Sequence, residues 1–270
     1  MKKQLLALGI PAAFALGSVA CSDSTAGTVS LALSTVRPAA PALTPALAAS
    51  ASASALSVAA VGDSTIIAVG NDTIILRSVE VVLREIELER VEVADCDSIS
   101  GNDDCEKFET GPVLVNLPLG ATATVTEVAI DAAPGMYNEL EFDIHKPDEV
   151  DDAAFIAAHA AFADVSIRVT GTFSQGGTRS DFTYTTDLNE EQEIALDPPL
   201  TVSEGATTNV TLRLDISTWF LNGGADALLN PATANKGGAN ENLVRDNIRA
   251  SIDAFRDDDR DGLDDDHEES

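Results

Sequence analysis

The sequence predicts a mainly β protein, built as an antiparallel β-sandwich or a barrel, with one or two short helices, one of them C-terminal. β-branched residues dominate from Thr65 onward, as is typical of strands. Gly, Pro and Asn separate many short segments of this kind, which indicates turns between strands. Helical segments do not alternate regularly with these strands, so a parallel α/β sheet is not expected.

The longest predicted strand is "DTIILRSVEVVLREIELERVEV", which begins at Asp72. Its apolar residues alternate, but the alternation changes phase in the middle, with Val79, Val81 and Leu83 on one parity and Ile86 and Leu88 on the other. We therefore expect a β-bulge, or a bend between two strands, near Arg84 and Glu85. Glu85, Glu87 and Glu89 then form an acidic solvent face opposite an apolar one.

Shorter strands and two helices follow the same reasoning. The strands are "STIIAVG", "GPVLVNLPL" and residues 124–130, 140–144, 165–169, 182–185 and 210–216. One helix is expected from Asp151. The second begins at Asn240, which offers a cap, and its stripe is Val244, Ile248, Ile252 and Phe255. We expect this second helix to lead directly into the acidic terminus, and Trp219 and Phe220 to close the core.

The N-terminus, residues 1–20, is predicted to be a signal peptide. Lys2 and Lys3 precede an apolar run of about 16 residues, which is short for a membrane span. Ser18, Val19 and Ala20 directly before Cys21 resemble the lipobox of bacterial lipoproteins. That resemblance implies that Cys21 receives acyl chains, palmitate among them, and holds the protein at a membrane. An ordinary cut after Ala20 would instead leave Cys21 as a free thiol.

Residues 21–56 are rich in Ala, Ser, Thr and Pro and contain no acid after Asp23. This composition predicts a lipid-anchored, low-complexity tether. We expect residues 57–256 to form one β-sandwich domain with its C-terminal helix, and residues 257–270 to form a separate acidic loop.

The chain carries 45 acidic and 16 basic residues, a formal charge of −29. Removing Lys2 and Lys3 with the signal peptide leaves 14 − 45 = −31. Such a charge repels nucleic acid and anionic lipid surfaces, so neither is expected as a partner.

Cys96 and Cys105 lie in "ADCDSISGNDDCEKF", on either side of the turn residues Gly101, Asn102 and Asp103. In an exported chain such a pair predicts a disulfide that staples a loop between strands. A metal or reactive-thiol role is the alternative.

The final stretch "FRDDDRDGLDDDHEES" has the spacing of a calcium loop, with carboxylates at positions 1, 3, 5, 9 and 12, a backbone carbonyl at position 7 and Gly262 at position 6. These ligand positions are Asp257, Asp259, Asp261, Leu263, Asp265 and Glu268. The stretch is similar to the calcium repeats of thrombospondin type 3 and dockerin-like modules, which implies weak calcium binding. A solvated acidic tail is the alternative.

The leader, Cys21 and the strand pair around "GPVLVNLPLG" and "APGMYNELEFDI" resemble bacterial surface lipoproteins with a transthyretin- or immunoglobulin-like β-sandwich domain. That resemblance implies a non-catalytic module of the bacterial cell envelope, lipid-anchored with the domain on the periplasmic or extracellular side. Its partner would be an envelope protein or a polysaccharide. The alternative is a secreted hydrolase of a polysaccharide or peptide that uses paired carboxylates such as Glu139 and Glu141, although no GxSxG or HExxH motif is present.

Overall fold

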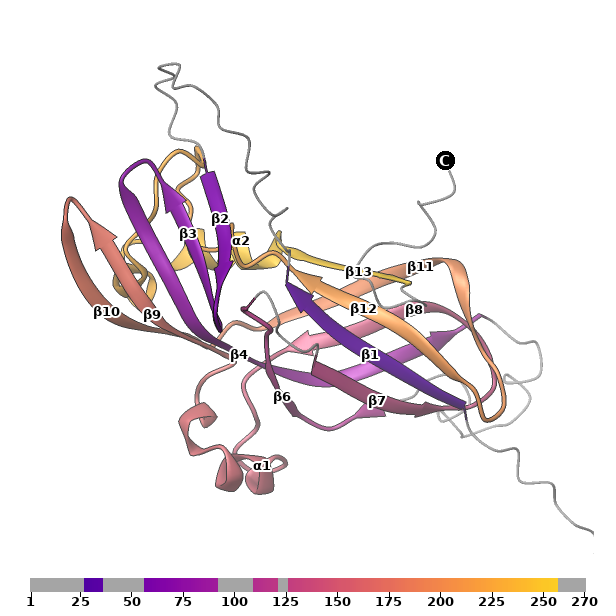
Figure 1. Cartoon of the computed structure of the whole chain (residues 1–270). Helices are drawn as coiled ribbons and strands as arrows, with labels where there is room; N and C mark the ends of the chain where they lie inside the picture. The colour runs from indigo at the N-terminus through magenta and orange to yellow at the C-terminus, as the bar shows by residue number, and fades with distance from the viewer. Residues whose placement is uncertain (1–26, 36–55, 92–108, 121–125, 257–270) are drawn as a thin grey trace, which may run out of the picture.

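The computed structural model describes residues 27–35, 56–91, 109–120 and 126–256 (Figure 1). Two β-sheets pack in a sandwich-like arrangement with two short helices, as the sequence predicts. The core between them is a single cluster of buried apolar residues. Among the described residues, no helix is both long enough and apolar enough to cross a membrane.

The larger sheet is organised around β4 (Asp72–Arg90), a strand of 19 residues. Different strands flank its two halves. The first half pairs with β3 (Ser64–Val69) and β9 (Ile167–Gln175), and the second with β6 (Val113–Asn116), β5 (Glu109–Thr110) and β8 (Gly135–Ile144). The sheet is completed by β2 (Leu56–Val61) beside β3, β10 (Thr178–Thr186) beside β9, and β11 (Glu190–Val202) beside β8.

The predicted bulge in this long strand is confirmed. The register between β4 and β8 shifts between Arg84 and Glu87, and Glu85 has a φ of +53°. The extra residue restores the alternation, so that Leu83, Ile86 and Leu88 are all fully buried.

The smaller sheet has the order β13 (Ile252–Arg256), β12 (Thr207–Leu214), β1 (Gly27–Thr35) and β7 (Thr126–Ala132). β1 runs parallel to β12 and antiparallel to β7. Residues 27–35 were expected in the tether, so that boundary is wrong. The physical reason is that Val29, Leu31 and Leu33 alternate on the core side, where all three are buried.

The C-terminal helix is present but shorter than predicted. α2 (Glu241–Arg249) buries Val244 and Ile248, and the chain then turns at Ser251, whose backbone N–H donates to the carbonyl of Ile248 at 3.0 Å. Ile252 and Phe255, expected on the helix stripe, belong to β13 instead, because the edge of β12 offers a backbone ladder. The acidic terminus therefore follows a strand, not a helix.

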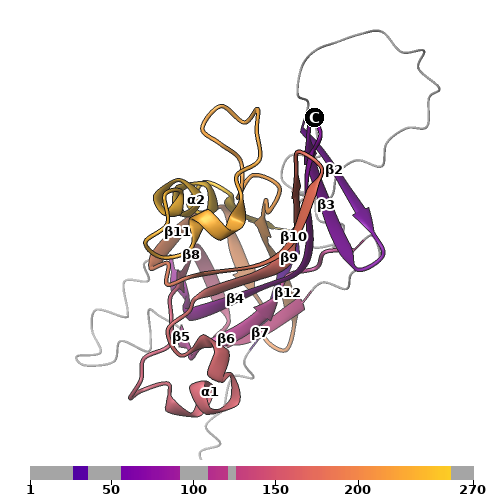
Figure 2. The same cartoon turned by 90° about the vertical axis from the view of Figure 1, so that its left-hand side faces the viewer.

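The first predicted helix is α1 (Ala153–Ala158), followed by a 3₁₀ turn at Ala160–Phe162. α1 and α2 lie on opposite sides of β4 (Figure 2). The predicted burial of Trp219 and Phe220 is confirmed: Phe220 meets Tyr184 edge to face at 5.3 Å, and the Trp219 indole donates to Ser251 Oγ at 2.8 Å. The predicted strands at 124–130, 140–144, 165–169, 182–185 and 210–216 correspond to β7, β8, β9, β10 and β12.

Candidate functional site

The predicted calcium ligands Asp257, Asp259, Asp261, Leu263, Asp265 and Glu268 lie outside the described residues, as do Cys21, Cys96 and Cys105. The structure does describe the strands that flank the segment with Cys96 and Cys105. Glu87 of β4 pairs with Glu109 of β5, so residues 92–108 connect two antiparallel strands. The disulfide itself stays a prediction.

The described residues present one dense acidic surface, on the outer side of the second half of β4, of β8 and of β11. In the central row, Glu87 lies opposite Glu141 on the neighbouring strand, and Glu141 lies opposite Glu193 on the next strand. In the flanking rows, Glu89 lies opposite Glu139, and Asp143 lies opposite Glu191. Glu85 lies at the bulge of β4. We call this the acidic face: Glu85, Glu87, Glu89, Glu139, Glu141, Asp143, Glu191 and Glu193.

Strand alternation places these carboxylates on one side. In β8 the acids alternate with Leu140, Phe142 and Ile144, which are almost fully buried. Because successive side chains point to opposite sides of a sheet, burying these three turns Glu139, Glu141 and Asp143 outward. The antiparallel register then aligns them with the outward acids of β4 and β11. β4 and β8 show this alternation in the sequence, whereas residues 190–193 of β11 are all polar, so only the register shows that the acids of the three strands lie together.

The crowding of like charges affects the protonation of this face. Burial raises the pKa of Glu139, and the charge of Glu89, a hydrogen bond shared with Glu89 and the charge of Glu193 raise it further. Burial also raises the pKa of Asp143, together with the charges of Glu85 and Glu191, while His145 and Arg84 partly oppose this. Both carboxyls therefore hold a proton at higher pH than isolated groups do.

Arg84 is the arginine at the margin of this face. Its guanidinium pairs with Asp152 at 3.0 Å and with Glu85 at 3.3 Å. The Asp152 side chain is only 8% exposed. The Arg84 guanidinium therefore neutralises a buried carboxylate, and this ion pair holds the α1 segment against β4. Among the described residues, no group of three or more His, Cys, Asp or Glu side chains is arranged to hold a metal ion. The acidic face is thus a spread surface, not a cage.

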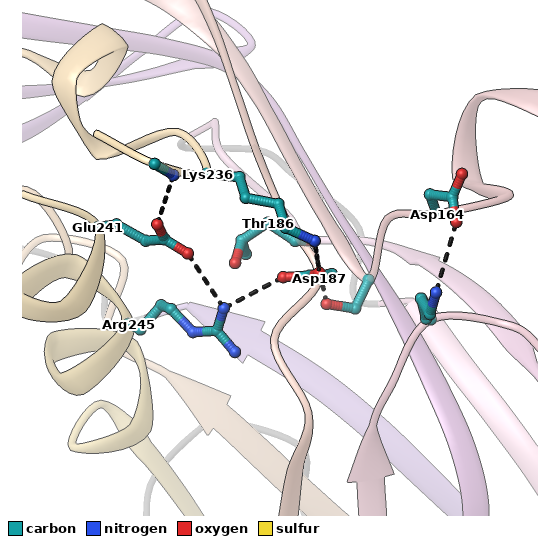
Figure 3. Close-up of polar contacts among 9 residues, drawn as sticks. Asp164, Thr186, Asp187, Lys236, Glu241 and Arg245 are labelled. Atoms are coloured by element: carbon teal, nitrogen blue, oxygen red, sulfur yellow. Dashed lines mark hydrogen bonds and ion pairs between the residues drawn. The ribbon is translucent and has the colours of Figure 1, made fainter.

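A second charged cluster joins the α2 region to the sheet (Figure 3). Arg245 pairs with Asp187 at 3.1 Å and with Glu241 at 3.4 Å, and Lys236 pairs with Asp187 at 2.6 Å. The Lys236 hydrogen bond holds the pKa of Asp187 below its ordinary value, and the same contact raises the pKa of Lys236. The two positive and two negative side chains of this cluster neutralise one another, so we interpret the cluster as a contact that stabilises the fold.

No protein-family model, curated protein or solved structure matches this chain. The expected likeness to envelope lipoproteins therefore depends on residue motifs, chiefly residues 1–21. The likeness to calcium repeats depends on residues 257–268. The acidic face, which sequence reasoning treated as an ordinary solvent face of one strand, is the feature that the described structure adds.

Proposed function

We propose that this protein is a non-catalytic lipoprotein of the bacterial cell envelope that binds a positively charged partner through the acidic face. The observation that carries the proposal is the central row, in which Glu87, Glu141 and Glu193 lie side by side on three strands. A basic segment of an envelope protein, or a polysaccharide with amino groups, has the matching chemistry. The leader and Cys21 support the location.

Energetics favour binding on this face. Like charges directly opposite each other across strands destabilise a sheet. Burial, and after it the charges of neighbouring acids, raises the pKa of Glu139 and of Asp143. A cationic partner would reduce the repulsion that the charges of Glu89 and Glu193 exert on Glu139, and this reduction favours binding on the acidic face.

The hydrolase alternative is less well supported by this geometry. Glycoside hydrolysis uses two carboxyl groups that flank a substrate bond and stand in different environments. Glu139 and Glu141 instead lie on the same side of one strand, in adjacent rows of the acidic face, and each has a like-charged neighbour opposite it. A surface of this kind is suited to a cationic ligand spread over several strands.

The binding proposal is tested with the mature full-length chain and a fluorescent ten-residue oligolysine probe. The row variant Glu87→Gln, Glu141→Gln, Glu193→Gln should weaken binding at least tenfold. The control variant Asp63→Asn, Glu149→Gln, Asp151→Asn removes equal charge from exposed positions off the face and should change binding less than twofold. Equal loss in both variants would show that only net charge acts and would contradict the proposed site.

The anchoring proposal is tested by replacing the acylated residue. Cys21→Ala should move the protein from the membrane fraction to the soluble fraction, and the wild-type protein should carry acyl mass on Cys21. Persistence of the variant at the membrane would contradict anchoring through this residue.

Calcium binding by the C-terminal loop is also a proposal, supported by the ligand spacing from Asp257 to Glu268. Because the loop follows β13, we expect bound calcium to stabilise the fold. About 2 mM calcium should raise the melting temperature of the wild-type protein and leave that of Asp261→Ala unchanged. No shift in the wild-type protein would identify the terminus as a solvated acidic tail.

A further inference from the structure

We propose that one end of the domain lies against the membrane while the opposite end points away from it. The membrane-facing end, which we call the anchor end, consists of the turns at residues 132–135 and 202–207. This inference depends on the proposed acylation of Cys21 and adds what the anchor alone does not specify, namely which surface of the domain faces the lipid.

The first step is that the fold begins at Gly27. β1 lies between two strands of the smaller sheet, and Leu31 and Leu33 are fully buried. The backbone N–H of Thr28 donates to the carbonyl of Ala206 at 2.9 Å, so β1 is held from its first residues onward. Residues 27–35 are therefore part of the domain and cannot serve as a spacer.

The second step is the length of chain between the anchor and the fold. From Cys21 to Gly27, six residues extend at most about 20 Å. A flexible tether over residues 21–56 would instead have a root-mean-square length of about 33 Å and an extended length above about 100 Å. The observed topology thus restricts Gly27 to within about 20 Å of the acylated residue.

The third step identifies what surrounds Gly27. Gly27 pairs with Ala132 of β7, at the start of one turn. A Cβ on Gly27 would lie 2.5 Å from a Val202 methyl carbon and 2.6 Å from the Ser203 carbonyl oxygen, so the other turn packs directly on it. Arg90, the last residue of β4, donates to the Pro134 carbonyl. The two turns of the anchor end therefore lie beside each other and beside the end of β4.

The fourth step locates the opposite end. β4 begins at Asp72, whose carboxylate accepts from the backbone N–H of Gly176 in the turn between β9 and β10 at 3.3 Å. A strand of 19 residues spans about 60 Å. The turns beside Asp72, which we call the far end, are therefore separated from the anchor end by about 60 Å of strand, measured along β4. Figure 1 shows the two ends on opposite sides of the molecule.

The chemistry of the two turns is compatible with neutral lipid headgroups. Ala133, Ser203 and Ala206 are exposed and uncharged, and Met136, just after the first turn, is 50% exposed. Glu204 is the one charged residue in the two turns. Since the mature chain carries a formal charge of −31, attraction to anionic lipid cannot hold this end in place. The short linker from Cys21 does so.

This orientation also refines the proposed partner. Arg90 lies opposite Tyr137 at the anchor end. Glu89 is one residue from Arg90, and Glu139 is two residues from Tyr137. The acidic face consequently lies in the membrane-proximal half of the domain. We infer that its cationic partner binds close to the membrane surface, as a basic segment flanking a membrane anchor would.

The test measures energy transfer from the protein to a rhodamine-labelled headgroup lipid in phosphatidylcholine vesicles. Full-length acylated protein carries a donor dye on a single introduced thiol, either Ser203→Cys at the anchor end or Asn71→Cys at the far end, with Cys96→Ser and Cys105→Ser in both. We expect at least threefold greater transfer from position 203. Inserting about 30 Gly and Ser residues after Ser24 should remove most of that difference.

Two results would overturn the inference, and they are distinguishable. Equal transfer from both positions at native linker length, in folded protein that floats with the vesicles, would reject the orientation while leaving the anchor intact. Protein that lacks acyl mass on Cys21 and does not float with the vesicles would reject the anchor and, with it, the orientation.

Discussion

Glu85 is the residue at which the backbone of β4 departs most from ordinary strand geometry. Its φ of +53° lies in the left-handed region, which costs an L-residue roughly 1–2 kcal/mol. The contact of its side chain with Arg84 at 3.3 Å is partly exposed and offsets little of this. The bulge is retained because, without the extra residue, the apolar side chains before and after it would point to opposite faces of the sheet.

Replacing Glu85 by Gly should therefore stabilise the fold. Glycine adopts positive φ without steric cost, and after its greater entropy loss on folding we expect a gain of about 0.5–1 kcal/mol in the free energy of unfolding, measured in urea. Glu87→Gly, at a regular strand position of the same face, serves as the control and should lose about as much. Loss of stability in Glu85→Gly would show that the Glu85 side chain contributes more than its backbone costs.

Glu139 should make stability depend on pH in a defined direction. Its pKa is raised in the folded protein, so its ionised form destabilises the fold above that pKa, and the penalty disappears as the pH falls toward the ordinary value. We expect Glu139→Gln to be more stable than the wild-type protein at pH 7 and equally stable at about pH 4, measured in urea. Glu149→Gln, which removes one exposed charge outside the acidic face, serves as the control, and a pH-dependent gain of the same size in both variants would contradict the prediction.

At the scale of elements, β1, β2, β5, β11 and β13 are strands that the sequence analysis did not predict, and β1 and β13 show the reason. Ala, Ser and Thr in "GTVSLALST" match the composition of a tether, and the partners of β1 begin about 100 residues (β7) and 180 residues (β12) later in the chain. Ile252 and Phe255 continue a helical spacing, yet the free edge of β12 pairs with them. In both cases a nonlocal backbone ladder decided the structure.

The role of β1 predicts a large stability effect within the segment expected to be a tether. Leu31→Ala removes a fully buried side chain between β12 and β7 and should cost about 2–5 kcal/mol. The control is Ser34→Ala in the same strand, because Ser34 Oγ is buried with no hydrogen-bond partner among the described residues and its loss should be neutral. A Leu31→Ala protein as stable as the wild type in urea would contradict the assignment of β1.

At the scale of the whole molecule, net charge opposes compactness. A formal charge of −29, concentrated in part on the acidic face, destabilises the folded state through self-repulsion that salt screens. We expect the melting temperature to rise by several degrees between about 10 and 500 mM sodium chloride, measured with chelator present. The Glu87→Gln, Glu141→Gln, Glu193→Gln variant should show a smaller rise. An equal rise would mean that the face is not a special source of repulsion.

The sequence by itself determined the fold class, most strands, the bulge near Glu85 and both helices, because alternation, turn residues and helical spacing are local signals. It also supplied the motifs at Cys21 and at 257–268, on which anchoring and calcium depend. Only the tertiary structure decided that β1 belongs to the core, that Ile252 lies in a strand and that acids from three strands form one face. Strand order and register are contacts between distant residues, and no local pattern encodes them.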